Sequence, residues 1–377
     1  MKLVFKIVKN TVFSILFLAI IFQSIVQLGY FYRDKDQNID TITGYYEQDK
    51  NSLDAVFVGS SSMYRFYISP QAWKENGFTS FTYSSAAMPF EATPYVLQEV
   101  NRTQKPKVVV IDTRNFVKQT AILLKETQTE EEKAYLEKTN SFIVNVTNNM
   151  PYGITRAKLI HSFVPNNLND QDEIDWQFDL GSNHNKWKDK SLKDYINYFK
   201  LLVKGEENLK EAEDELLKIN CTRLKFKIRK QVRWEPNSAE LNEKASIPKE
   251  RLKIIDDLIS YAKKENIKVL FLSTPYSTNI DYWKVENALA EYVENKGFDY
   301  LNCNLHYDDI GIDFNTDYYD DRHTNVLGAQ KFTKYIGNYL VDKYNLKTSA
   351  NKTTKENFDK AYDEWVKYST PKLQNIK

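Results

Sequence analysis

The sequence predicts an α/β protein with a doubly wound parallel sheet, a largely helical insertion and an N-terminal transmembrane helix. Short apolar, β-favouring runs alternate with amphipathic helical stretches, which is the pattern of strand-helix-strand units. Several of these runs end in Gly, Ser, Thr or Asn, as strands do at the ligand-binding edge of an open sheet. With 377 residues, 42% of them hydrophobic, the chain can form one large domain with insertions or two domains.

The N-terminal segment predicts a membrane anchor. Residues 11–32 contain no charged side chain and are mostly apolar, and about 20 apolar residues suffice to cross a bilayer. Three lysines within residues 1–10 favour a cytoplasmic N-terminus, so the rest of the chain is expected outside the cell membrane. A cleaved signal peptide is the alternative, disfavoured because no clean Ala-x-Ala site follows. Residues 33–52 are polar and are interpreted as a juxtamembrane linker.

Residues 53–345 carry the sheet-building pattern and are expected to form one extracytoplasmic domain. Its predicted strands are residues 55–58, 77–85, 107–112, 267–272 and 298–302. Its predicted helices are residues 91–102, 249–264, 281–295 and 326–344.

The pattern lapses in residues 118–247, which are rich in Lys, Glu and Asn and are interpreted as an insertion that caps or flanks the sheet. Helices are expected within it at residues 130–138, 192–203 and 206–219. Its tryptophans indicate burial, with stacking on sugar rings as the alternative; they are Trp176, Trp187 and Trp234. Residues 346–377 are expected to be a polar tail with one surface helix at 355–366.

Charge and cysteine content exclude several classes of protein. The 52 basic and 51 acidic residues give a net charge of +1, which offers no electrostatic case for a nucleic-acid partner. Cys221 and Cys303 are the only cysteines, so a zinc motif and a disulfide framework are both excluded, although one bridge between the two stays open.

The first predicted strand leads into a candidate nucleophile. Gly59 allows a sharp turn after the strand, and Ser61 would then stand at the strand tip with its hydroxyl facing a cleft. The alternative is an ordinary turn in which a serine caps the following helix.

A candidate base lies more than 250 residues later, just before the last predicted helix of the domain. Among four histidines, only His323 lies in an acidic loop at that sheet edge, and Asp320 three residues earlier can reach its Nδ1. Nε2 would then face a serine, as in nucleophilic catalysis. The alternatives are a loop of solvated charges, or a metal site made from Asp317, Asp320, Asp321 and His323. With one nitrogen ligand and no second histidine, neither a metal nor a cofactor is expected.

Gly59-Ser60-Ser61 and Asp320-x-x-His323 resemble the first and last sequence blocks of SGNH/GDSL-type esterases, over residues 53–116 and 248–345. The resemblance implies a three-layer, flavodoxin-like α/β/α fold with Ser61 as nucleophile, His323 as base and Asp320 orienting the imidazole. It also implies an oxyanion hole formed by the Ser61 amide and Asn115. The family's glycine donor is missing, and Ser84 or Ser85 occupies that region.

With its anchor, the chain looks like the membrane-bound branch of AlgJ/AlgX/DltD-like proteins, which acylate cell-envelope polymers. This resemblance implies transfer of an acyl group, expected to be acetyl, through acyl-Ser61 to a polysaccharide. It also implies a multi-spanning membrane O-acyltransferase as the partner that supplies the acyl group.

Two other functions stay open, an envelope carbohydrate esterase or deacetylase, and a non-catalytic scaffold of polysaccharide synthesis. Three arginines near the expected sheet edge, Arg65, Arg114 and Arg322, are candidates for holding an anionic substrate. Pairing with the carboxylates of Asp112, Asp317 or Asp321 is the alternative that we favour.

Overall fold

The computed structural model describes residues 2–32, 42–139, 142–163, 177, 184–204 and 223–376. The chain divides into two compact units. One comprises residues 1–37 and 150–211, and the other comprises residues 38–149 and 212–377. The sheet and the candidate site both belong to the second unit.

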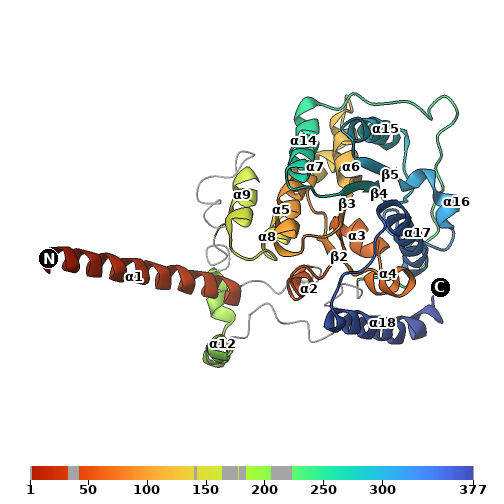
Figure 1. Ribbon diagram of the computed structural model, residues 1–377. Helices are drawn as coiled ribbons and strands as arrows, with labels where there is room; N and C mark the ends of the chain where they lie inside the picture. The colour runs from red at the N-terminus through yellow and green to blue at the C-terminus, as the bar shows by residue number, and fades with distance from the viewer. Residues whose placement is uncertain are drawn as a thin grey trace. The chain divides into compact units, whose positions relative to one another are not determined.

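The second unit is built on a five-stranded parallel sheet in the order β2-β1-β3-β4-β5 (Figure 1). The strands are β1 Ala55–Gly59, β2 Ser80–Ser84, β3 Val108–Asp112, β4 Val269–Ser273 and β5 Asp299–Asn302. All five predicted strands are therefore confirmed. This strand order is the flavodoxin-like one, in which the chain reverses direction across the sheet between β1 and β3. Ligands of such sheets bind at that switch point, outside the carboxyl ends of the strands.

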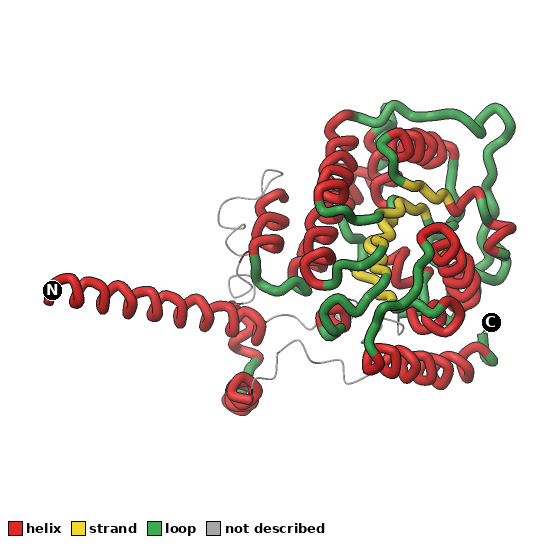
Figure 2. Tube along the Cα trace, viewed as in Figure 1, coloured by secondary structure: helices red, strands yellow, loops and turns green. Residues whose placement is uncertain are grey.

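Helices cover both faces of the sheet, and Figure 2 shows the strands between them. On one face α3, α4 and α17 pack on alternate strand residues such as Phe57 and Val110. The helices at the other face include α5, α6, α14 and α15 (Figure 1). Their bounds are α3 Ser61–Phe66, α4 Ser69–Asn76, α5 Thr93–Thr103, α6 Arg114–Leu123, α14 Lys249–Lys264, α15 Ile280–Asn295 and α17 Val326–Tyr344. Because β1, β3 and β4 are buried on both sides, their sequences are continuous apolar runs rather than alternating ones. The edge strand β2 is also buried, but its sequence alternates polar and apolar residues.

Smaller elements complete the described chain. They are α2 Thr43–Tyr46, η2 Phe90–Ala92, α7 Glu130–Thr139, α8 Ile143–Thr147, α9 Ile154–Phe163, η5 His184–Asp189, α12 Leu192–Lys204, η6 Cys303–Leu305 and α16 Tyr307–Ile310. The helices predicted at residues 130–138 and 192–203 are thus confirmed, whereas the one predicted at 206–219 lies outside the described residues.

The C-terminal segment is more than the expected polar tail. Helix α18, Lys352–Leu373, is longer than predicted, and it buries Phe358, Ala361 and Trp365. It packs against α4, where Trp73 Nε1 donates a hydrogen bond of 2.9 Å to Asp359. The sequence suggested a surface helix because its apolar residues are few and widely spaced among charges.

Two predicted boundaries also differ. Ile42 and Tyr45, assigned to the linker, are buried, and the Tyr45 hydroxyl hydrogen-bonds Thr103. Residues 42–52 therefore belong to the folded unit. Residues 118–123, assigned to the insertion, continue α6, which packs against α15. Within the insertion, residues 223–247 contain neither a helix nor a strand, and residues 238–242 form a turn.

Helix α1, Lys2–Tyr32, contains an apolar span at Val4–Gly29 that is long enough to cross a membrane. Its length and composition agree with the predicted anchor. Which side of the membrane each end faces is still an expectation from the lysines.

Candidate active site

Ser61 lies where β1 turns into α3, at the carboxyl edge of the sheet. Gly59 is required there, because a Cβ at this position would stand 2.7 Å from Asp112 Cβ and 2.9 Å from Met63 Cγ. Ser60 precedes the helix in an extended conformation, and Ser61 is its first residue. A first-turn N–H has no acceptor within its own helix, so the Ser61 amide is available to a ligand.

The neighbouring serine hydroxyls have other partners. Ser62 Oγ donates to the buried carboxylate of Asp112 and lies 3.0 Å from Ser60 Oγ. These bonds tie the turn to the end of β3, which leaves Ser61 as the serine presented to the imidazole.

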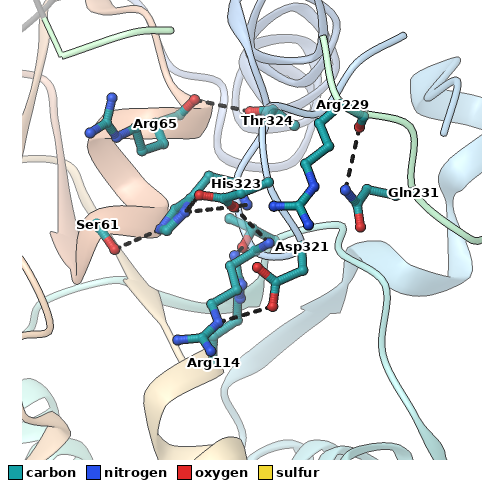
Figure 3. A network of polar contacts seen from close by, with 11 residues as sticks. Ser61, Arg65, Arg114, Arg229, Gln231, Asp321, His323 and Thr324 are labelled. Carbon is teal, nitrogen blue, oxygen red and sulfur yellow. Dashed lines mark hydrogen bonds and ion pairs between the residues drawn. The ribbon is translucent and has the colours of Figure 1, made fainter. Parts of the chain in front are cut away.

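Ser61, His323 and Asp320 form a hydrogen-bonded chain, of which Figure 3 shows the contact between Ser61 and His323. Ser61 Oγ lies 2.8 Å from His323 Nε2, and His323 Nδ1 lies 3.0 Å from both Asp320 carboxylate oxygens. An ionised Asp320 accepts only from an Nδ1–H, so the neutral imidazole has its acceptor at Nε2. The Ser61 hydroxyl then donates to Nε2, which is the geometry that a general base requires.

A tight loop holds the two distant segments together. An antiparallel bridge joins Tyr318 to Thr324, and Asp320 Oδ1 accepts the His323 backbone N–H at 2.8 Å. The Thr324 hydroxyl donates to the carbonyl of Arg65 in α3 at 2.9 Å, as Figure 3 shows. Since α3 begins at Ser61, this bond fixes the imidazole relative to the nucleophile.

The electrostatic surroundings favour a neutral base beside an ionised acid. Burial lowers the pKa of His323 below its ordinary value, and the charges of Arg114 and Arg65 lower it further, while Asp320 opposes the shift. Burial alone would raise the pKa of Asp320, but hydrogen bonds from His323 and from the Arg322 amide outweigh it and hold that pKa well below its usual range. At neutral pH, His323 can therefore accept a proton.

Two further groups in the cavity wall are candidates for meeting an oxyanion formed at Ser61. Asn115 lines the cavity in front of Ser61, and its Nδ2 donates to Met88 O at 2.7 Å. Ala87, in the turn closed by Met88 N and Ser85 O, also lines the cavity and has a φ of +50°. That left-handed conformation favours glycine, so Ala87 stands where a glycine would be expected.

Ser84 and Ser85 do not face the nucleophile. Both are fully buried, neither lines the cavity, and their hydroxyls have no hydrogen-bond partner among the described residues. Ser84 is the last residue of β2, paired with Gly59. The structure therefore does not bring the Ser84 or Ser85 side chain to the cavity, whereas Ala87 lines it.

A cavity of about 520 Å³ opens in front of the serine. Its wall combines polar groups with the rings of Tyr135, Tyr276 and Tyr282. Lys118 also lines it, with its ammonium 3.7 Å from the centre of the Tyr135 ring. Burial lowers the pKa of Lys118 to about 8, and the charges of Arg322 and Arg114 add to that lowering. A cavity of this size and composition can admit a sugar-sized ligand.

The three predicted arginines have different surroundings. Arg322 lines the cavity, and its Nε lies 3.2 Å from an Asp321 carboxylate oxygen. Arg114 is buried in the cavity wall over the Tyr276 ring, 4.1 Å from its centre. Arg65 lies behind the imidazole rather than in the cavity, between the rings of Tyr64 and Tyr319. Among the described residues, an ion pair with a predicted carboxylate is present for Arg322, and Arg114 meets Asp112 through its backbone N–H, which donates to Oδ1 at 3.3 Å.

Within the described residues, no group of three or more His, Cys, Asp or Glu side chains is placed to hold a metal ion. Asp317, one of the four residues considered for such a site, is instead buried against Lys331 Nζ at 2.7 Å.

Lys118 and Ala87 are among the cavity residues that the sequence analysis missed. Lys118 lies one helical turn after Arg114 and faces the same cavity, a spacing visible in the sequence once α6 is recognised. Ala87 gave no signal, because alanine carries no preference for a left-handed backbone.

The tryptophans of the insertion were expected to be buried, with stacking on sugars as the alternative. Trp234 is half-buried and packs against Trp283, whereas Trp187 is exposed in the other unit, so the expected burial is wrong for Trp187. Neither of these two lines the cavity, and Trp176 lies outside the described residues. Comparisons of the chain with protein-family models, curated proteins and solved structures found no match.

Proposed function

We propose that this protein is a membrane-anchored serine O-acyltransferase that modifies an extracytoplasmic polysaccharide through an acyl-Ser61 intermediate. The observation that carries the proposal is the chain from Ser61 Oγ through the His323 imidazole to the Asp320 carboxylate. The resemblance to SGNH/GDSL-type enzymes supports the same roles for these residues.

In the first half-reaction, Ser61 Oγ attacks the carbonyl carbon of an acyl donor while His323 Nε2 takes the hydroxyl proton. Asp320 holds the tautomer and stabilises the imidazolium. The negative charge on the carbonyl oxygen is met by the Ser61 amide, the Asn115 side chain and the Ala87 amide, and each such donor contributes about 3 kcal/mol. His323 then protonates the leaving group, and the acyl-enzyme forms.

In the second half-reaction, a sugar hydroxyl gives its proton to His323 and attacks the acyl carbon. The bond from that carbon to Ser61 Oγ then breaks, and His323 returns the proton to the serine oxygen. The size of the cavity and its tyrosine-lined wall support an acceptor larger than water. A multi-spanning membrane acyltransferase that brings the acyl group across the bilayer is the proposed donor partner, and acetyl is the proposed acyl group.

Substitution of single serines tests the proposal. Full-length protein in detergent is treated with a fluorophosphonate probe and, separately, with 4-nitrophenyl acetate and an oligosaccharide. Ser61→Ala is expected to abolish labelling and to lower acyl transfer by at least about 10³-fold. Ser60→Ala is the matched control, because its hydroxyl makes no bond to His323, and it should still be labelled.

Equal labelling of wild type and Ser61→Ala would reject the enzyme assignment and favour a scaffold. Release of free acetate without acetylated sugar, in wild type, would reject transfer and favour an esterase.

A further inference from the structure

Helix α12 and the short helix η5 lie at the end of α1 that is remote from the N-terminus, within the same unit (Figure 1). The Tyr198 hydroxyl of α12 donates to Gln27 O at 2.7 Å. The centre of the Phe31 ring lies 4.9 Å from that of Tyr195 and 4.7 Å from that of Tyr198. Because the apolar span of α1 ends at Gly29, these contacts fix α12 at the level where α1 would leave a bilayer.

The exposure of α1 shows how far this covering reaches. Residues 4–24 are all exposed, whereas Val26 and Gly29 are buried. Within the described chain, protein therefore covers α1 only at its last turns and leaves most of the apolar span free to meet lipid. The elements that cover α1 lie at the boundary of the span rather than along it.

Helix α12 runs across α1 rather than beside it. Figure 2 shows α1 from the side and α12 nearly end-on, so the two axes cross steeply. A helix that crosses a membrane-spanning helix at the end of its apolar span follows the bilayer surface. The direction of α12 therefore suits a position in the membrane interface.

The exposed side of α12 is apolar. Leu192, Ile196 and Phe199 are 76%, 46% and 66% exposed, and their spacing of four and three residues places them on one face of the helix. The tyrosines that contact α1 lie on the adjoining stripe. Lys193 and Asn197 lie away from the apolar face and are exposed as well. The helix thus presents a polar side and an apolar side that no described residue covers.

The composition of this region is that of a segment that binds a membrane surface. Residues 184–204 contain six lysines and two aspartates, which gives a net charge of +4, whereas the whole chain carries only +1. Trp187 of η5 is exposed, and the Lys190 ammonium lies 5.1 Å from the centre of the Phe31 ring. Basic amphipathic helices with Trp, Phe and Leu on the apolar side lie in the interface plane, and Trp and Tyr are enriched at that depth.

We propose that α12 and η5 lie on the bilayer surface, with Leu192, Ile196 and Phe199 inserted among the lipid chains and the lysines among anionic headgroups. Lipid is the occupant that the structure favours, because the apolar face adjoins the exposed span of α1. The membrane would then hold this unit in two ways, by a helix that crosses it and by a helix that lies on it. The inference rests on α1 crossing a membrane and uses no part of the proposed acyl chemistry.

Spin labels on single cysteines test which surroundings each side of α12 meets. The full-length protein carries Cys221→Ser, and the native Cys303 is buried and does not react with the label. The apolar side is labelled through Ile196→Cys or Phe199→Cys, and Asn197→Cys is the matched control on the polar side. All three native side chains are exposed, so the labels should not disturb folding. The proteins are studied in liposomes of phosphatidylcholine, with and without anionic phosphatidylglycerol.

Collision of each label with two relaxing reagents reports its surroundings, because molecular oxygen concentrates among lipid chains whereas a charge-neutral nickel chelate stays in water. We expect the labels at Ile196 and Phe199 to meet oxygen several-fold more often, and the chelate several-fold less often, than the label at Asn197. The depth of the first two labels should be about 5–10 Å below the headgroup boundary. Phosphatidylglycerol should increase the contrast between the two sides, because it attracts the lysines.

Frequent collision with the chelate at all three positions would overturn the proposal, since α12 would then lie in water. Rare collision with both reagents on the apolar side would overturn it as well, because that face would then be covered by protein, either by this chain or by a partner. The same contrast with and without phosphatidylglycerol would reject the role given to the lysines. None of these readouts depends on Ser61, so the proposed function stands or falls separately.

Discussion

At the scale of single residues, His323 can act as a base only while it is neutral. Because burial lowers the pKa of His323 below its ordinary value near 6.5, the protonated, inactive form should dominate only at lower pH. We expect kcat/KM for 4-nitrophenyl acetate to rise with pH through an apparent pKa below 6.5 and then level off. Asp320 raises the pKa of His323, so Asp320→Asn should shift the rise of kcat/KM to still lower pH. The same change should reduce the maximal kcat/KM about 10³-fold or more.

A pH profile of kcat/KM for both proteins checks this. A rise of kcat/KM with an apparent pKa above 7 in the wild type, or a shift of that rise to higher pH in Asp320→Asn, would contradict the assigned roles of the two residues.

Gly59 is the residue on which the turn before Ser61 depends. An alanine Cβ there would overlap Asp112 Cβ, which is held in the end of β3 and cannot easily move. We expect Gly59→Ala to lower the free energy of unfolding by about 1–3 kcal/mol and to slow fluorophosphonate labelling of Ser61. Gly153→Ala is the control, since its Cβ would meet nothing closer than 4.0 Å. Thermal unfolding and labelling rates measure both effects, and equal behaviour of the two variants would refute the steric argument.

At the scale of elements, local periodicity was enough to predict the sheet. The runs around Val56, Val110 and Leu270 are apolar because both faces of these strands are buried, and the bounds predicted for α17 match the structure. Periodicity failed where burial depends on a partner far along the chain. Tyr45 is buried by contacts that include Thr103, and Trp365 lies in a helix that packs on α4. Neither contact can be predicted from the residues near Tyr45 or Trp365 in the sequence.

Helix α18 should therefore contribute to the free energy of unfolding of the domain rather than be a dispensable surface helix. Trp365 is only 2% exposed, whereas its neighbour Val366 is 39% exposed. We expect Trp365→Ala to reduce the free energy of unfolding by about 3–5 kcal/mol, because it empties a buried site, and Val366→Ala to change it by less than about 0.5 kcal/mol. Chemical denaturation of the detergent-solubilised proteins compares the two. Similar midpoints for both variants would mean that α18 is not part of the folded core.

At the scale of the whole molecule, the candidate site joins segments separated by 262 residues. The sequence predicted its two ends, because a serine after a strand and an Asp-x-x-His segment carry recognisable chemistry. It could not predict the bond from the Thr324 hydroxyl to the Arg65 carbonyl, or the path of residues 225–231 beside the loop. Each of these contacts uses at least one backbone atom, and any residue type supplies such an atom.

The last prediction concerns the orientation of α1 in the membrane. Its apolar span begins after Lys2, and Lys6 and Lys9 lie near the same end, so the N-terminus should stay in the cytoplasm and residues 42–376 should face outward. Alkaline phosphatase, which folds only in an oxidising compartment, is fused after Lys377 and should be active, while a phosphatase fused before Met1 should not. Changing the three lysines to Glu should reduce the activity of the C-terminal fusion, because the charge asymmetry that sets the orientation is lost. An inactive C-terminal fusion in the unaltered chain would place the serine on the cytoplasmic side, away from any envelope polymer, and the acceptor proposed here would have to be abandoned.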